Sequence, residues 1–208
     1  ATGANELWIV DVAGGTARRL LGDLNTVFGD GYSWLPDSRG LLVTLQVKGQ
    51  GPAPVAGGIP TGPAIQQTQA DAGVRAIRTY QDLLSNEADA RLFDFYARAQ
   101  PAKVALNGDT TPLSSAGIYL DLSVSPDGRH VLAERVQRPY SYLVPADDFP
   151  RRIEVLSSDD GKLQHTVADL PLVEGLPTGN DAVPTGVRSV SWRADAPATL
   201  VWAEAQDG

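Results

Sequence analysis

The sequence lacks cysteine and methionine altogether and contains only two histidines in 208 residues. Without cysteine there is no disulfide scaffold, no thiolate nucleophile and no thiolate-bound zinc. Two histidines are too few for a histidine-rich metal site, so we expect neither a metal nor another cofactor. Position 1 is Ala rather than Met and opens no signal peptide. We therefore expect the chain to be part of a longer polypeptide.

Positive charge and long apolar runs are also scarce. Lys and Arg number 17 against 25 Asp and Glu, which gives a net charge of −8. An acidic chain repels phosphate backbones, so a nucleic-acid partner is not expected. There is no run of 18 apolar residues, so we expect no membrane-spanning helix. With 42% hydrophobic and 20% charged residues, the composition is that of a globular protein, here one domain over 1–208.

Turn-forming residues, in contrast, are abundant, with 21 Gly and 15 Pro. They separate short β-rich segments: 7–12 is followed by a turn at 13–16 and a returning segment at 17–20. The same hairpin pattern recurs around the turns at 36–40, 107–109, 125–129, 159–162 and 193–197. The sequence therefore predicts six β-hairpins.

The hairpins repeat in a fixed register. The repeated positions are Ser33, Trp34, Pro36 and Asp37, then Ser123, Val124, Pro126 and Asp127, then Ser191, Trp192, Ala194 and Asp195. Two hairpins per repeat are typical of the blades of a β-propeller. The sequence therefore predicts an all-β fold, a partial β-propeller of about three blades of antiparallel four-stranded sheet.

Most side chains of this repeat are expected to be structural. The Trp residues before the turns would pack between neighbouring blades, and the Asp residues would accept hydrogen bonds from backbone N–H groups of the turns. These residues are Trp34, Trp192, Asp37, Asp127 and Asp195. Both histidines, His130 and His165, fall in predicted strands and are expected to be ordinary strand residues.

Two insertions lengthen the repeat. The first, about 48–100, begins as a Gly- and Pro-rich loop and then changes to helical spacing. In its helical part, Thr79 can cap a short helix at 80–84 and Asn86 can cap a longer one at 87–99. An apolar stripe of Leu92, Phe93 and Tyr96 would pack against the rim of the sheets or against a neighbouring domain. The second insertion, about 137–152, is predicted to be an ordered loop.

No motif for a reaction centre is present. The sequence has no Gly-x-Ser-x-Gly, no phosphate-binding glycine loop and no calcium-loop spacing. No catalytic residue is therefore assigned. Function is expected on the loops of a scaffold.

Several longer strings, in the insertions and after them, lie at 60–67, 78–84, 92–96, 138–145, 149–152 and 192–198. They resemble one branch of the prolyl oligopeptidase family, the glutamyl endopeptidases with related bacterial dipeptidyl and acylaminoacyl peptidases. The resemblance implies an N-terminal propeller of about seven blades that caps a C-terminal α/β-hydrolase domain holding a Ser-Asp-His triad. No position of this chain matches the triad.

The resemblance predicts that the chain is the substrate-gating, non-catalytic part of a serine peptidase, inactive alone. Its partners would be the hydrolase domain of the parent chain and a peptide substrate, with cleavage after Glu as one option. Recognition of Glu requires a cation, ideally the planar fork of Arg. Arg138, with Tyr140 and Tyr142, is the predicted substrate-binding group. The alternative is a structural Arg138 paired with Asp147 or Asp148.

Two other functions fit the repeats. A stand-alone propeller-like protein-binding module is compatible with the hairpins alone. A self-sufficient propeller enzyme would need carboxylates or metal ligands in a closed channel, which about three blades cannot form. Unpaired strands at both ends would favour self-association through the open blade edges. By the family resemblance, we expect a periplasmic or secreted location.

Overall fold

The computed structural model describes residues 5–55, 80–174 and 183–206. These residues form twelve strands, one α-helix and one short 3-10 helix, and every strand pair is antiparallel. The elements are β1 (Asn5–Asp11), β2 (Thr16–Leu24), β3 (Tyr32–Trp34), β4 (Gly40–Gln46), α1 (Glu87–Ala97), β5 (Arg98–Ala105), β6 (Thr110–Pro112), β7 (Gly117–Val124), β8 (His130–Val136), η1 (Ala146–Asp148), β9 (Arg151–Ser157), β10 (Leu163–Leu170), β11 (Gly186–Trp192) and β12 (Leu200–Ala205).

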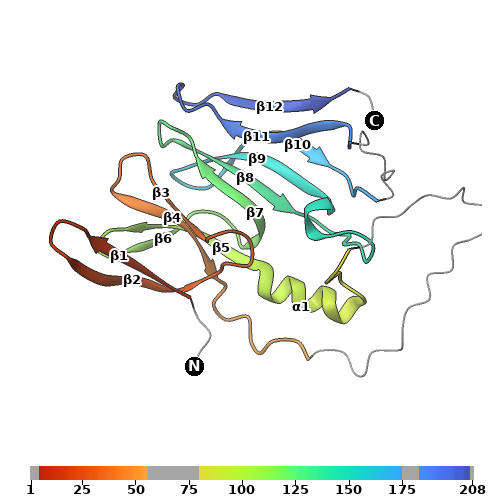
Figure 1. Ribbon diagram of the computed structural model, residues 1–208, viewed down its shortest axis with the longest axis horizontal. Helices are drawn as coiled ribbons and strands as arrows, with labels where there is room; N and C mark the ends of the chain where they lie inside the picture. The colour runs from red at the N-terminus through yellow and green to blue at the C-terminus, as the bar shows by residue number, and fades with distance from the viewer. Residues whose placement is uncertain (1–4, 56–79, 175–182, 207–208) are drawn as a thin grey trace, which may run out of the picture.

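By hydrogen bonding, β1 to β10 form one ten-stranded sheet, and β11 and β12 form a separate hairpin. Because β2 and β4 share one residue pair and β5 and β7 share two, these strands divide into two four-stranded units with one hairpin on either side (Figure 1). Strands β3 to β6 pair in chain order, and so do β7 to β10. The β1–β2 hairpin lies next to the first unit and the β11–β12 hairpin next to the second (Figure 1). The prediction of a mostly antiparallel β fold with a helical insertion is confirmed at this level.

The boundaries of the units differ from those of the sequence repeat by one hairpin. In sequence, the repeat pairs each hairpin with the next one from β1 onward, so that β1–β2 joins β3–β4 and β5–β6 joins β7–β8. The hydrogen-bonded units start at β3 and β7 instead. Strands β4 and β5 pair in unbroken register from Gly40↔Ala105 to Gln46↔Ala99 although the first insertion separates them in sequence. By contrast, β2 and β4 share only the pair Leu24↔Leu45. The sequence-based grouping of hairpins is therefore wrong, because strands that are far apart in sequence pair more extensively than strands that are close.

Both faces of each unit are buried, which explains the continuous apolar run in β4. Leu41 and Val43 pack on one face, in a core shared with the β1–β2 hairpin. Leu42 points to the opposite face and packs with Val131 and Leu156 of the second unit. The second unit in turn shares a core with the β11–β12 hairpin. The sheets are thus stacked face to face along the chain.

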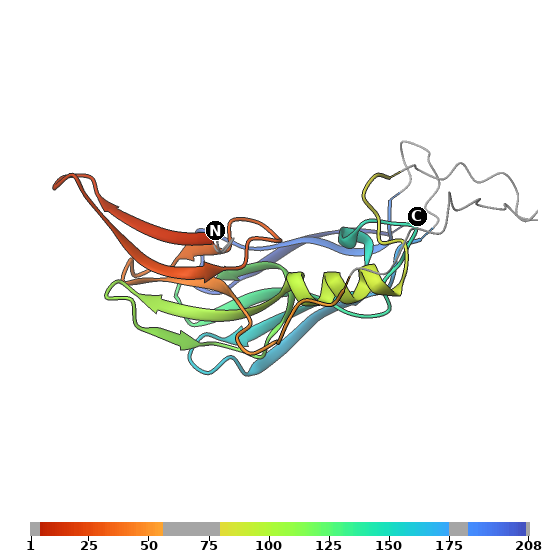
Figure 2. The same ribbon diagram turned by 90° about the horizontal axis from the view of Figure 1, so that it is seen from below.

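The two ends of the strands carry different connections. The tight turns that join β1 to β2, β3 to β4, β5 to β6, β7 to β8, β9 to β10 and β11 to β12 gather at one end (Figure 1). Helix α1 and the loop 137–150 lie at the other end, as Figures 1 and 2 both show. We call these ends the turn face and the insertion face. Since long irregular segments usually carry function, the insertion face is the natural place for a site.

Helix α1 begins where the sequence predicts it. The side chain of Asn86 accepts hydrogen bonds from the backbone N–H groups of Ala88 (2.8 Å) and Asp89 (3.0 Å). The helix ends at Ala97 rather than residue 99, because Arg98 already belongs to β5 and pairs with Ile118 of β7.

One expectation for the first insertion is wrong. Residues 80–84 are not helical, and Asp82 has a positive φ of 57° that no α-helix accommodates; Thr79 lies outside the described residues. Of the predicted apolar stripe, Phe93 packs inward and Tyr96 is 57% exposed, and packing of the stripe against a neighbouring domain stays a prediction. Three alanines of α1 are buried as well, namely Ala88, Ala90 and Ala97, and Ala97 packs with Ile118 of β7 and Val136 of β8.

The two repeat tryptophans have different surroundings. Trp192 packs between the β11–β12 hairpin and the second unit, and its Nε1–H donates to the carbonyl oxygen of Ser123 at 3.1 Å. Trp34 was expected in the core but is 52% exposed. Trp192 contacts β7, which is the first strand of the unit before it. The described residues before β3 form only the β1–β2 hairpin, so Trp34 has no equivalent strand to contact among them.

The turn residues of the repeat behave largely as expected. The carboxylates of Asp37 and Asp127 each accept a hydrogen bond from the N–H two residues later, at 2.9 and 3.0 Å. Asp195 differs, because its carboxylate pairs with the side chain of Arg193 at 2.7 Å. His130 and His165 lie in β8 and β10 as predicted.

Candidate functional site

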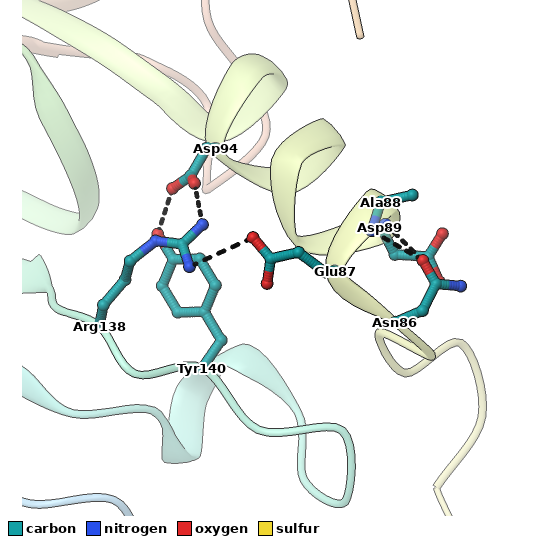
Figure 3. A network of polar contacts seen from close by, with 7 residues as sticks. All are labelled: Asn86, Glu87, Ala88, Asp89, Asp94, Arg138 and Tyr140. Atoms are coloured by element: carbon teal, nitrogen blue, oxygen red, sulfur yellow. Dashed lines mark hydrogen bonds and ion pairs between the residues drawn. The ribbon is translucent and has the colours of Figure 1, made fainter. Parts of the chain in front are cut away.

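A polar cluster on the insertion face joins α1 to the loop 137–150 (Figure 3). The guanidinium of Arg138 forms an ion pair with Asp94 and lies 3.9 Å from the carboxylate of Glu87. The hydroxyl of Tyr140 donates a hydrogen bond to the other oxygen of Asp94. Arg138 also sits over the ring of Tyr140, 4.6 Å from its centre. We call these four residues the Arg138 cluster.

An aromatic layer supports this cluster. The ring of Phe93 on α1 meets Tyr140 edge to face at 5.0 Å and Phe149 at 5.8 Å. Tyr140 and Phe149 stack at 5.2 Å with an interplanar angle of 17°. Phe149 follows the short helix η1 and is only 2% exposed. The helix and the loop are therefore held together by both apolar and polar contacts, which makes the insertion face an ordered surface.

The electrostatics of the cluster favour the paired state. The hydrogen bond to Asp94 is the main cause that raises the pKa of Arg138. Burial, and then the hydrogen bond to Asp94, raise the pKa of Tyr140, so its hydroxyl remains a proton donor at neutral pH. Because Arg138 and Asp94 are about half exposed, their ion pair contributes at most about 1 kcal/mol.

The structure brings two of the three predicted binding residues together. Arg138 and Tyr140 are in contact, whereas Tyr142 is 43% exposed and makes no hydrogen bond or ring contact within the described residues. The alternative prediction paired Arg138 with Asp147 or Asp148. Arg138 does form ion pairs, but its partners are Asp94 and Glu87 of α1. Binding of substrate by Arg138, Tyr140 and Tyr142 stays a prediction.

A second feature of the insertion face was not predicted. A cleft of about 590 Å³ opens between the end of β2, the segment after β4 and the C-terminal end of α1. Its charged lining residue is Arg98, which the sequence interpretation had placed inside a helix. No signal in the sequence marks Arg98, because Asp94 lies four residues before it and would be its ion-pair partner in the predicted helix 87–99.

A pair of acidic residues lies on neighbouring strands of the second unit. Asp121 of β7 and Glu134 of β8 are register partners, and burial is the main cause that raises the pKa of each. Glu134 forms an ion pair with Arg151 of β9. Neither carboxylate hydrogen-bonds a hydroxyl or a histidine among the described residues, so this pair lacks the contacts of an activated nucleophile.

The described residues contain neither a metal-binding cluster nor a membrane-spanning helix. No group of three or more His, Asp or Glu residues in 5–55, 80–174 and 183–206 could hold a metal ion. Within these same segments, no helix has the length and apolar character needed to span a membrane.

Two known plant proteins align with all or nearly all of the chain. It is 38% identical over 211 aligned residues to a rice protein (Oryza sativa subsp. japonica) named probable glutamyl endopeptidase, chloroplastic, and covers 22% of that protein. It is 38% identical to the Arabidopsis thaliana protein of the same name, with 97% of the chain aligned to 21% of the relative. No protein-family model matches the chain.

The chain is therefore homologous to a segment of these glutamyl endopeptidases and spans about a fifth of their length. The resemblance to glutamyl endopeptidases that the sequence strings indicate is confirmed. Both relatives are named as chloroplastic, which concerns those proteins alone. A periplasmic or secreted location for this chain stays a prediction.

Proposed function

We propose that this chain is the substrate-gating, non-catalytic propeller part of a serine peptidase that cleaves peptides after glutamate. Its bond-breaking groups would lie in an α/β-hydrolase domain elsewhere in the parent polypeptide. The observation that carries the proposal is the homology of the whole chain to about a fifth of two glutamyl endopeptidases.

The stacking of the sheets supports the propeller part of the proposal. In a propeller, each four-stranded blade packs both faces against its neighbours, as the two units do here. By the sequence repeat, the β1–β2 hairpin corresponds to the third and fourth strands of a unit, and the β11–β12 hairpin corresponds to the first and second. The described strands thus amount to two complete blades and two half blades.

The position of the insertions supports the gating part. The connections between the second and third strands, β4 to β5 and β8 to β9, are the ones that contain α1 and the loop 137–150. Both extend from the insertion face, where the Arg138 cluster ties them together (Figure 3). We infer that this face meets the hydrolase domain and narrows the path of a substrate to it.

Loosening the Arg138 cluster in the parent peptidase should widen that path. Asp94→Ala removes the ion pair with Arg138 and the acceptor for the Tyr140 hydroxyl. If the variant loses about 1 kcal/mol of stabilisation, the fraction of molecules in which α1 and the loop 137–150 are apart should rise about fivefold. We expect kcat/KM for a folded protein substrate to rise by about this factor relative to kcat/KM for a short Glu-containing peptide.

The matched control is Asp195→Ala, which removes an exposed ion pair with Arg193 on the turn face. This variant should leave the ratio of the two kcat/KM values unchanged. If Asp94→Ala and Asp195→Ala gave the same ratio as the unmodified peptidase, the gating role of the insertion face would be wrong.

The half blades lead to a separate expectation for the 208-residue chain alone. Strands β1 and β12 each pair with one neighbour within the described residues, and their exposed apolar side chains include Val10 and Trp202. Open edges with apolar faces favour association. Light scattering should detect oligomers, and Val10→Lys should shift them toward monomer. A monomer at all concentrations for the unmodified chain would contradict this expectation.

A further inference from the structure

We propose that the cleft at the C-terminal end of α1 binds a carboxylate group of a peptide through the guanidinium of Arg98. The cleft is separate from the Arg138 cluster and is lined by β2, the segment after β4 and α1. If the proposed function holds, this carboxylate belongs to a substrate; the binding itself does not depend on the reaction.

The backbone around Arg98 is held from several directions. Its N–H donates to the carbonyl oxygen of Asp94, and Arg98 pairs with Ile118 at the start of β7. The buried side-chain amide of Asn25 donates to the carbonyl oxygens of Tyr96 (2.8 Å) and Arg98 (3.1 Å). Asn25 thus satisfies carbonyl groups that a helix end otherwise leaves without partners. The base of the Arg98 side chain is fixed before any ligand arrives.

The guanidinium of Arg98, in contrast, is exposed and has no hydrogen bond or ion pair with the described residues. The cleft contains no Asp or Glu among its lining residues. Because the five donors of a guanidinium match a carboxylate in a two-pronged contact, the free group at this place fits an acidic ligand.

The comparison with Arg138 favours Arg98 as the available cation. A carboxylate that approached Arg138 would have to displace Asp94 and approach Glu87. At Arg98 no acid of the described residues has to move. Binding at Arg98 therefore carries no such displacement cost, although both arginines lie on the same face of the molecule.

The rest of the cleft fits a peptide rather than a bare anion. Phe95 and Tyr96, in edge-to-face contact at 5.1 Å, provide an aromatic wall. Gly49 and Gly51 also line the cleft, and a Cβ atom at either would meet nothing within 4 Å. The volume of about 590 Å³ lies within the usual range of ligand pockets. The side-chain amides of Gln46 and Gln50 donate to the carbonyl oxygens of Leu24 (3.4 Å) and Phe95 (3.5 Å), and their own oxygens can still accept a hydrogen bond from a peptide N–H group.

The test is peptide binding to the 208-residue chain, measured by calorimetry at low salt. Three short peptides of otherwise equal sequence are compared: one with a central Glu and blocked ends, one with Gln and blocked ends, and one with Gln and a free C-terminal carboxylate. We expect at least one carboxylate peptide to bind about tenfold or more tightly than the blocked Gln peptide. The carboxylate peptide that binds more tightly shows whether the cleft prefers a Glu side chain or a free C-terminus.

Two variants locate the binding. Arg98→Gln should abolish the preference for a carboxylate, and Arg98→Lys, which keeps the charge without the fork, should retain part of it. The matched control is Arg91→Gln, because Arg91 is an exposed arginine of α1 outside the cleft and without an ion pair in the described residues. Circular dichroism checks that each variant is folded.

Equal binding of all three peptides, or an unchanged preference in folded Arg98→Gln, would overturn the proposal. This result would leave the gating function untouched, since that function is tested by the selectivity of the parent peptidase. Conversely, failure of the gating test would not alter a carboxylate preference measured on the chain alone.

Discussion

Gly161→Ala is expected to destabilise the chain by at least about 3 kcal/mol. Gly161 lies in the turn between β9 and β10 with a positive φ of 66°, which an L-amino acid side chain disfavours. A Cβ atom at this position would also overlap the carbonyl oxygen of Leu113, just after β6. Neither the turn nor the neighbouring backbone can move without disturbing the contact between the two units.

Gly128→Ala is the matched control for this prediction. Gly128 lies in the Asp-Gly turn between β7 and β8 with φ of 76°, but a Cβ atom there would meet nothing within 4 Å. Only the unfavourable φ remains, so the expected loss is about 1 kcal/mol. Urea unfolding of both variants measures the difference. Equal losses would show that the turn at Gly161 does not press against Leu113.

Phe149→Ala should cost about 3–5 kcal/mol in the free energy of unfolding. Its ring is almost completely buried and contacts both Phe93 of α1 and Tyr140 of the loop 137–150. Truncation leaves a cavity between the two insertions, so α1 should also become more open to hydrogen exchange than the strands.

The control for Phe149 is Tyr142→Ala in the same loop. Tyr142 is exposed and makes no ring contact in the described part of the chain, so its loss should stay within about 0.5 kcal/mol. Thermal unfolding and hydrogen exchange measure both variants. If exchange in α1 were unchanged in Phe149→Ala, the aromatic layer would not be what holds the helix on the insertion face.

The hairpins could be predicted from sequence because their signals are local. Turn residues such as Asp37 and Asp127 bond to the backbone two residues away, and apolar β-rich segments flank them. The start of α1 at Asn86 is equally local, since a cap involves only the first turn. Patterns of this kind need no knowledge of what lies across the sheet.

The grouping of strands into units and the surroundings of Trp34 depended on long-range pairing. Strand β5 is joined to β4 across the first insertion, a contact that no neighbouring residue signals. The exposure of Trp34 depends on which strands precede the first unit, while the equivalent Trp192 has its neighbour in place.

The candidate site was predictable only in part for the same reason. Arg138 and Tyr140 are close in sequence, so their proximity could be anticipated. Their shared partner Asp94 lies 44 residues away from Arg138, on a helix whose docking depends on buried aromatic rings. The availability of Arg98 became visible only once the structure showed which arginines have acidic partners.

The central claim is that this chain shapes and admits the substrate while the nucleophile lies elsewhere in the parent polypeptide. The most direct measurement is labelling of the parent peptidase with a fluorophosphonate that reacts with activated serines, followed by peptide mapping of the modified residue. We predict a single labelled serine outside residues 1–208 and no labelling of the isolated chain. A labelled serine within these residues, or peptide hydrolysis by the isolated chain, would contradict the claim.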